Sequence, residues 1–242
     1  MDNHSVSERR SVRWAGCFLF LLTISMLMTT IQAHAAGIKR SPGSPLGSSI
    51  PVVMIDAGHG GIDGGASHGD ILEKHITLDL ARRLYGLLEA GGYLAVLNRD
   101  GDYALSDDNR WLNSRSRHTR DLAQRKELAE TLKAGLVVSV HVNWSPSASS
   151  RGPLVLYRSK EGRSYLLARS IQEQLNAVYG TRAVPKAGKP FYLLNQTSGA
   201  AVIVEAGFIS SPADRALLCS PAGRQKLAEA VADGVATYLM GV

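Results

Sequence analysis

From about residue 52 onward, short apolar runs of strand length alternate with segments whose apolar residues recur at helical spacing. The run Val52–Asp56 ends in a glycine-rich turn, and the next segment carries apolar residues every three or four positions from Ile76 to Leu88. Strands that alternate with helices pair into a largely parallel sheet with helices on both faces. We therefore predict a single α/β domain. Its functional site is expected at the carboxyl ends of the strands, where such sheets bind their ligands.

The same alternation continues to the end of the chain, without an internal repeat or a second domain. Residues 102–120 interrupt it as a polar stretch that we interpret as a loop. Strands are predicted at about residues 52–56, 94–97, 136–140, 154–157, 191–194 and 201–205, and helices at about residues 73–90, 121–133, 162–178 and 212–240.

The start of the chain does not fit this domain, and residues 1–35 are predicted to be a signal peptide. Arginines within residues 9–13 precede an apolar run, residues 14–31, which ends at Ala33-His34-Ala35, the small-x-small form of a cleavage site. An uncleaved membrane anchor is the alternative, because the run approaches the length that spans a bilayer. The arginine pair leaves twin-arginine export open beside the Sec route. Residues 36–50, rich in Gly, Pro and Ser, are predicted to be a linker to the folded domain, residues 51–242.

The chain carries a formal net charge of +6, which suits an exported protein at a polyanionic envelope surface. Nucleic acid is also polyanionic, but the chain has no zinc-finger spacing, and we expect no nucleic-acid partner. Removal of residues 1–35 leaves Cys219 as the one cysteine, which excludes an intramolecular disulfide. We expect a monomer stabilised by its apolar core.

Polar, reactive residues stand at the ends of three predicted strands. His59 follows the first strand, His141 follows the third, and Glu205 ends the strand at 201–205. Glu73 opens the first helix, and a short loop returns it to the same edge of the sheet. Two imidazoles and a carboxylate from separate elements form a set of three zinc ligands, which leaves a fourth coordination position for water. Glu205 is then the candidate that moves a proton from water to a leaving group.

The spacing of these residues alone does not exclude simpler roles for them. His59 could be a loop residue, His141 a strand cap, and Glu205 a buried carboxylate bonded to backbone amides. Surface or satisfied core positions are expected for three other histidines, His68, His75 and His118.

The local sequences around the candidate residues resemble the zinc-dependent N-acetylmuramoyl-L-alanine amidases, the family that includes bacterial cell-separation amidases and several autolysins. Residues 53–66 and 72–78 are similar to its first motifs, residues 139–143 to its second histidine motif, and residues 202–214 to its catalytic glutamate motif. The motifs occur in the family's order, and the resemblance spans about residues 51–240. By this resemblance, His59, Glu73 and His141 are the zinc ligands and Glu205 is the catalytic acid/base.

The resemblance implies a peptidoglycan hydrolase that cleaves the amide between the lactyl group of N-acetylmuramic acid and L-alanine. A zinc carboxypeptidase that trims stem peptides and a non-catalytic wall-binding module are the alternatives. We expect the protein in the periplasm, or at the cell surface or secreted if the wall is Gram-positive.

The chain departs from the family's usual pattern at a few positions. Ala57 stands where proline is frequent, Gly135 where aspartate is usual, and Trp144 where alanine is frequent; the polar stretch Gly101–Arg120 is also longer than usual. Division-associated members carry a long insertion before the catalytic glutamate, with a helix that plugs the zinc site. Here 64 positions separate His141 from Glu205. We therefore predict no blocking helix and no requirement for an activator protein.

Overall fold

The computed structural model describes residues 51–147, 149–158, 162–188 and 191–241. The predicted signal peptide, residues 1–35, and the predicted linker, residues 36–50, lie outside these ranges. Among the helices of the described ranges, none is both long and apolar enough to cross a membrane.

A six-stranded, mostly parallel sheet forms the centre of the domain. Its strand order is β4-β1-β5-β8-β6-β7, and every neighbouring pair is parallel except β6 and β8. A two-stranded hairpin, β2 (Ser67–His68) and β3 (Ile71–Leu72), stands outside the sheet. The six strands are β1 (Val53–Ala57), β4 (Ala95–Leu97), β5 (Leu136–Asn143), β6 (Leu154–Tyr157), β7 (Lys186–Ala187) and β8 (Ala200–Phe208).

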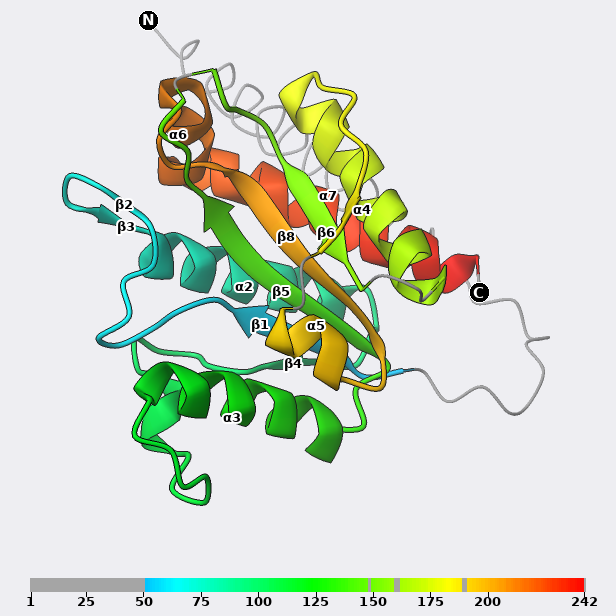
Figure 1. Cartoon of the computed structure of the whole chain (residues 1–242). Helices are drawn as coiled ribbons and strands as arrows, with labels where there is room; N and C mark the ends of the chain where they lie inside the picture. The colour runs from blue at the N-terminus through cyan, green and yellow to red at the C-terminus, as the bar shows by residue number, and fades with distance from the viewer. Residues whose placement is uncertain (1–50, 148, 159–161, 189–190, 242) are drawn as a thin grey trace, which may run out of the picture. The chain divides into compact units, whose positions relative to one another are not determined.

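Helices cover both faces of the sheet, as the alternating pattern predicts (Figure 1). On one face, α2 (Glu73–Ala90), α4 (Gly162–Tyr179) and α7 (Pro221–Met240) pack together, with α6 (Pro212–Cys219) beside α7. On the other face lie α3 (Arg117–Thr131), the short helix α5 (Tyr192–Gln196) and the 3-10 turn η1 (Leu105–Asp107). Successive residues of β1 alternate between the two cores: Val53 and Ile55 face one, Met54 the other. The predicted α/β fold is thus confirmed.

Several predicted elements differ in the structure. Residues 192–194 form the start of α5 and not a strand, and Phe191 is the N-cap of that helix. Leu193 and Leu194 pack against the core under α3, and a run this short fits a buried helix as well as a strand. The predicted helix 212–240 is two helices. Ser220 is extended between them, its hydroxyl accepts from the N–H of Gly223, and Pro221 starts α7.

The remaining differences concern β5, β8 and the polar stretch before α3. β5 continues to Asn143, so His141 lies on the strand and not after it. β8 likewise continues to Phe208, so Glu205 lies within its strand and not at the end of it. The polar stretch contains η1, and α3 begins at Arg117, earlier than predicted, because the Ser116 hydroxyl accepts from the N–H of Thr119 and caps the helix.

Candidate metal centre

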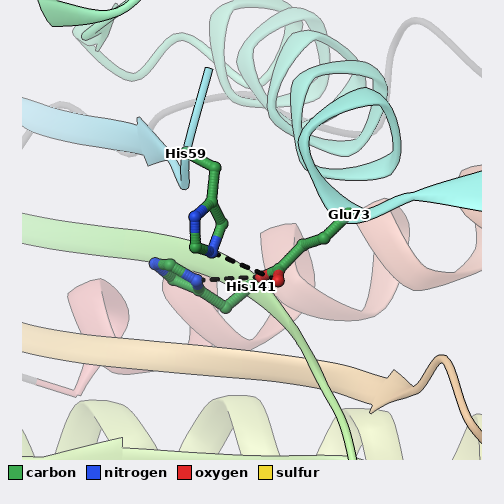
Figure 2. A group of neighbouring side chains, drawn as sticks. All are labelled: His59, Glu73 and His141. Atoms are coloured by element: carbon green, nitrogen blue, oxygen red, sulfur yellow. Dashed lines mark hydrogen bonds and ion pairs between the residues drawn. The ribbon is translucent and has the colours of Figure 1, made fainter. Parts of the chain in front are cut away.

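Two histidines and a glutamate from three elements converge at the carboxyl ends of the central strands. His59 lies in the turn after β1, Glu73 is the first residue of α2, and His141 lies on β5. His59 Nε2 is 3.1 Å from Glu73 Oε2, and His141 Nδ1 is 3.0 Å from Glu73 Oε1. Figure 2 shows both rings directed at the one carboxylate. One ligand atom from each residue lies within 4.8 Å of the others, so the structure brings together all three predicted ligands.

The Glu73 carboxylate is buried and fixed by the backbone as well as by the rings. Its Oε1 accepts from the N–H of Val142 at 2.9 Å, and its Oε2 accepts from the N–H of Ala66 at 2.7 Å. Burial acts to raise the pKa of Glu73, but the hydrogen bonds and charges of His141 and His59 hold it far below its ordinary value. Glu73 therefore stays ionised, which a metal ligand requires.

His59 is polarised from both sides of its ring. Its Nδ1 lies 3.0 Å from Oδ2 of Asp63, which leaves Nε2 directed at Glu73. Burial acts to lower the pKa of His59, but Glu73 and Asp63 together raise it to about 9. Burial likewise acts to raise the pKa of Asp63, but His59, the Gly65 N–H and the charge of Arg117 hold it below its ordinary value. A carboxylate behind a metal-binding imidazole is the usual arrangement for fixing its tautomer.

Two glycines leave room for the candidate ligand side chains, and the space around these side chains tests whether the group suits a metal ion. A Cβ on Gly58 would lie 2.5 Å from Cε1 of His141, and a Cβ on Gly65 would lie 2.5 Å from Oε2 of Glu73. Gly65 also has a φ of 67°, a conformation that favours glycine. Two imidazole nitrogens and a carboxylate oxygen, packed without an intervening side chain, are a donor set that fits a transition-metal cation.

A buried arginine holds the turn that carries His59. The φ of His59 is 61°, in the left-handed region, which costs a non-glycine residue free energy unless its surroundings fix it. Arg125, 3% exposed, donates from Nη2 to the carbonyl oxygen of His59 at 2.8 Å and from Nη1 to that of Ala57 at 2.9 Å. Its charge is balanced by Asp56 and Asp121, each 2.6 Å away. Neither Arg125 nor Asp63 is among the residues expected from the sequence.

Glu205 stands beside this cluster on the neighbouring strand. Its Cα pairs with that of His141 in the register of β5 and β8. Burial raises the pKa of Glu205, and the nearby Glu73 adds to the increase against the opposing charge of His141. Within the described part of the chain, no hydrogen bond to the Glu205 carboxylate is present. A half-buried carboxyl with a raised pKa is suited to taking up and giving back a proton.

A cavity of about 250 Å³ connects these residues to the helices on the same face of the sheet. His59, His141 and Glu205 line one side. The other side is formed by α3 and by the start of α5. The residues that line this side include His118, Asp121, Leu122, Phe191, Tyr192 and Leu193. His118 is exposed, as expected for an ordinary surface histidine, but its place on the wall of this cavity is not apparent from the sequence.

Known proteins resemble this chain across nearly all of the described domain. The germination-specific N-acetylmuramoyl-L-alanine amidase of Bacillus subtilis is 30% identical over 231 residues, which cover 95% of this chain and 96% of that protein. Escherichia coli N-acetylmuramoyl-L-alanine amidase AmiA is 28% identical over 289 residues, or 97% and 92% of the two chains.

Solved structures agree with these sequence relatives. The CwlD amidase from Clostridioides difficile, solved in complex with the GerS lipoprotein, has a TM-score of 0.74 and 30% identity, covering 79% of this chain and 100% of that one. For AmiC2 of Nostoc punctiforme, the TM-score is 0.66 at 30% identity, with 80% and 99% covered. A family model described as N-acetylmuramoyl-L-alanine amidase matches residues 53–237. Because that match covers most of the chain and the relatives match it nearly end to end, the chain belongs to the N-acetylmuramoyl-L-alanine amidase family of peptidoglycan hydrolases.

Proposed function

We propose that this amidase uses one Zn²⁺ held by His59, Glu73 and His141, with Glu205 as the general acid/base. The observation that carries the proposal is the convergence of both imidazoles on the Glu73 carboxylate. Two nitrogen donors and one oxygen donor make a catalytic zinc set, because three protein ligands leave a position for water. When bound, zinc lowers the pKa of that water and polarises the scissile carbonyl.

The chain's own residues then orient the reaction and move the proton. The bond cleaved is the amide between the lactyl carbonyl of N-acetylmuramic acid and the nitrogen of L-alanine. Glu205 takes a proton from water and gives it to the departing amine, since an amine leaves as a neutral group only when it is protonated. The raised pKa of Glu205 favours the step in which it holds this proton. Asp63 and Arg125 keep the His59 ring and its turn in place during these transfers.

We further propose that the mature protein is exported, acts as a monomer and needs no activator. Between His141 and Glu205 the described elements are β6, α4, β7 and α5, and the start of α5 lines the cavity as part of its wall. The solved CwlD relative is in complex with a lipoprotein, GerS, so independence from a partner needs its own test. A steady rate of wall hydrolysis by the purified protein alone would support it, and strict dependence on an added partner would overturn it.

The proposed reaction is tested by mass spectrometry of the soluble products from purified sacculi treated with the zinc-loaded protein. The expected products are free stem peptides that begin with L-alanine and glycan strands without peptide. Release of single amino acids would assign a carboxypeptidase instead. Binding to sacculi without any product would assign a wall-binding module. Glu205→Gln is the inactive comparison, and Glu229→Gln, an exposed glutamate on α7, is the matched control for loss of a carboxylate.

A further inference from the structure

The polar stretch before α3 contains a concentration of positive charge that the chemistry of the metal centre does not use. Residues 109–120, here called the arginine segment, carry four arginines and no acidic residue. The arginines are Arg110, Arg115, Arg117 and Arg120. Arg110 and Arg115 are exposed, and neither guanidinium group makes a hydrogen bond or ion pair with another described residue. Their side chains are therefore available to a ligand.

The positive charges of these arginines do not stabilise α3, in whose first turn Arg117 and Arg120 lie. The segment opens α3, which has no acidic residue in its first turn. Positive side chains at a helix N-terminus are unfavourable, because the helix dipole places its positive end there. Sequences break such local rules mostly at sites that serve a function. The stability of α3 therefore does not account for the arginines.

The backbone of the arginine segment is held in place. Asn109, 1% exposed, donates from Nδ2 to the carbonyl oxygen of Arg120 at 2.7 Å, and its Oδ1 accepts from the N–H of Leu112 at 3.1 Å. Trp111 Nε1 donates to Oε1 of Gln124 on α3 at 3.1 Å. The loop is thus bonded to α3 at more than one point. Because it is already ordered, ligand binding loses less conformational entropy than it would with a free loop.

The arginine segment adjoins the catalytic cavity. His118, within the segment, lines the cavity together with His59 and Asp63. Arg117 is close enough to Asp63 for its charge to act on that carboxylate. From there the segment continues outward to a shallow hollow lined by residues 109–114, Arg120 and one carboxylate, Asp107. A substrate that extends beyond the scissile amide can reach this surface.

We propose that the arginine segment binds the acidic stem peptides next to the one being cleaved, and so increases the affinity of the enzyme for polymeric peptidoglycan. This inference rests on the proposed function. Stem peptides carry free carboxylates, which the planar guanidinium group pairs with in a bidentate manner. Each exposed pair is weak, but a polymer that repeats its carboxylates engages several arginines at once.

The test compares two substrates and two double variants of the full-length, zinc-loaded protein. One variant combines Arg110→Gln with Arg115→Gln. The control combines Arg182→Gln with Lys226→Gln, two exposed cations outside the segment, so both variants lose the same charge. The substrates are sacculi stripped of attached polymers and a soluble disaccharide with a single stem peptide. We expect the arginine variant to raise KM for sacculi by about two- to tenfold at unchanged kcat, and to leave kcat/KM for the soluble substrate unaltered.

Each other outcome overturns the inference. An equal rise in KM with the control variant would assign the effect to net charge. An equal loss on the soluble substrate would place the arginines' action at the metal centre. Peptide-free glycan strands that compete as well as peptide-bearing strands would make the sugar the ligand. Failure of the proposed function is seen separately: the wild-type protein would release no peptide from either substrate, and cosedimentation of the two variants with sacculi would then still decide the inference.

Discussion

His141 and Glu205 are direct partners in the pairing of the two central strands, with their Cα atoms in register across β5 and β8. Val140 and Val204, the pair before them, face the core under α2, α4 and α7. Since side chains alternate along a strand, His141 and Glu205 both face the cavity on the opposite side. The spacing between a proposed ligand and the proposed acid/base is therefore fixed by the register of the sheet, and the ladder becomes irregular immediately beyond them.

Two variants of this residue pair distinguish a role in proton transfer from a role in metal binding. Glu205→Gln keeps the shape of the side chain, and we expect it to bind one zinc per chain while losing activity by about 10²–10⁴-fold. His141→Ala should lose both zinc and activity, because it removes a proposed ligand. Metal content by atomic absorption and peptide release from sacculi are measured together. Loss of zinc from Glu205→Gln would contradict the assigned role of this residue.

Asp63 is expected to tune the affinity of the site through His59. Asp63→Asn replaces the carboxylate that accepts from His59 Nδ1 at 3.0 Å, so the ring is less basic and less firmly oriented. We expect zinc affinity to fall by about 10–100-fold, measured by competition with a chromogenic chelator. Asp70→Asn, an exposed change in the turn of the β2–β3 hairpin, is the control and should have no effect. Unchanged affinity in Asp63→Asn would show that the hydrogen bond does not matter for the metal.

Gly58 is expected to be required because the ring of His141 occupies the space of a side chain. Gly58→Ala puts a Cβ 2.5 Å from that ring, which must move away from Glu73. We expect zinc binding to be lost while the circular dichroism spectrum stays folded. Gly86→Ala in the middle of α2 is the matched control, since its Cβ would meet nothing within 4 Å. This control should bind zinc normally and raise stability by about 0.5–1 kcal/mol.

Removal of Arg125 is expected to weaken the fold and the site together. Arg125→Met leaves the buried Asp56 carboxylate without its ion pair, and breaking such a pair costs about 3–5 kcal/mol in the free energy of unfolding. Urea denaturation measures this loss. Arg125→Lys should recover part of the stability, because it restores the charge, but less of the zinc affinity, because a lysine cannot reproduce the fork that bonds the carbonyls of Ala57 and His59.

The stability of the metal-free protein is expected to depend on pH through His59 and Glu73. The folded-state pKa of His59 is raised from 6.5 to about 9, so its contribution is complete below about pH 6.5 and is lost as pH rises toward 9. The pKa of Glu73 is lowered from 4.5, so its contribution is present above that pH and is lost as pH falls below it. Urea midpoints between pH 5 and 10 should therefore decline on the alkaline side. His59→Gln should abolish this decline, and a decline that persists in the variant would assign it to other groups.

Patterns that act over a few neighbouring residues made most of the fold predictable. The first helix has the predicted bounds, Glu73–Ala90, because its apolar period ends at two glycines, of which Gly91 caps it. The run at residues 191–194 carried no such signal, and its helical form follows from packing against the core under α3. The direction of individual strands could not be predicted either. β6 runs antiparallel to β8, and the residues of β6 do not indicate in which direction the strand runs.

Some residues of the candidate site could likewise be predicted from the sequence, and others could not. His59, Glu73, His141 and Glu205 could be found because strand ends and the first helix turn meet at one edge of a parallel sheet, although their roles in metal binding and proton transfer stay predictions. Arg125 could not be found, since a charged residue in a polar helical segment gives no sign that it is buried. Its position follows from its ion pair with Asp56 on β1, which forms only once the chain is folded.

The outermost strands of the sheet are also its shortest. β4 has three residues and β7 has two, so each edge offers few free N–H and C=O groups to another chain. Long exposed edges are the usual template for aggregation between sheets. Short edge strands of this kind limit pairing between the sheets of neighbouring copies of this peptidoglycan hydrolase.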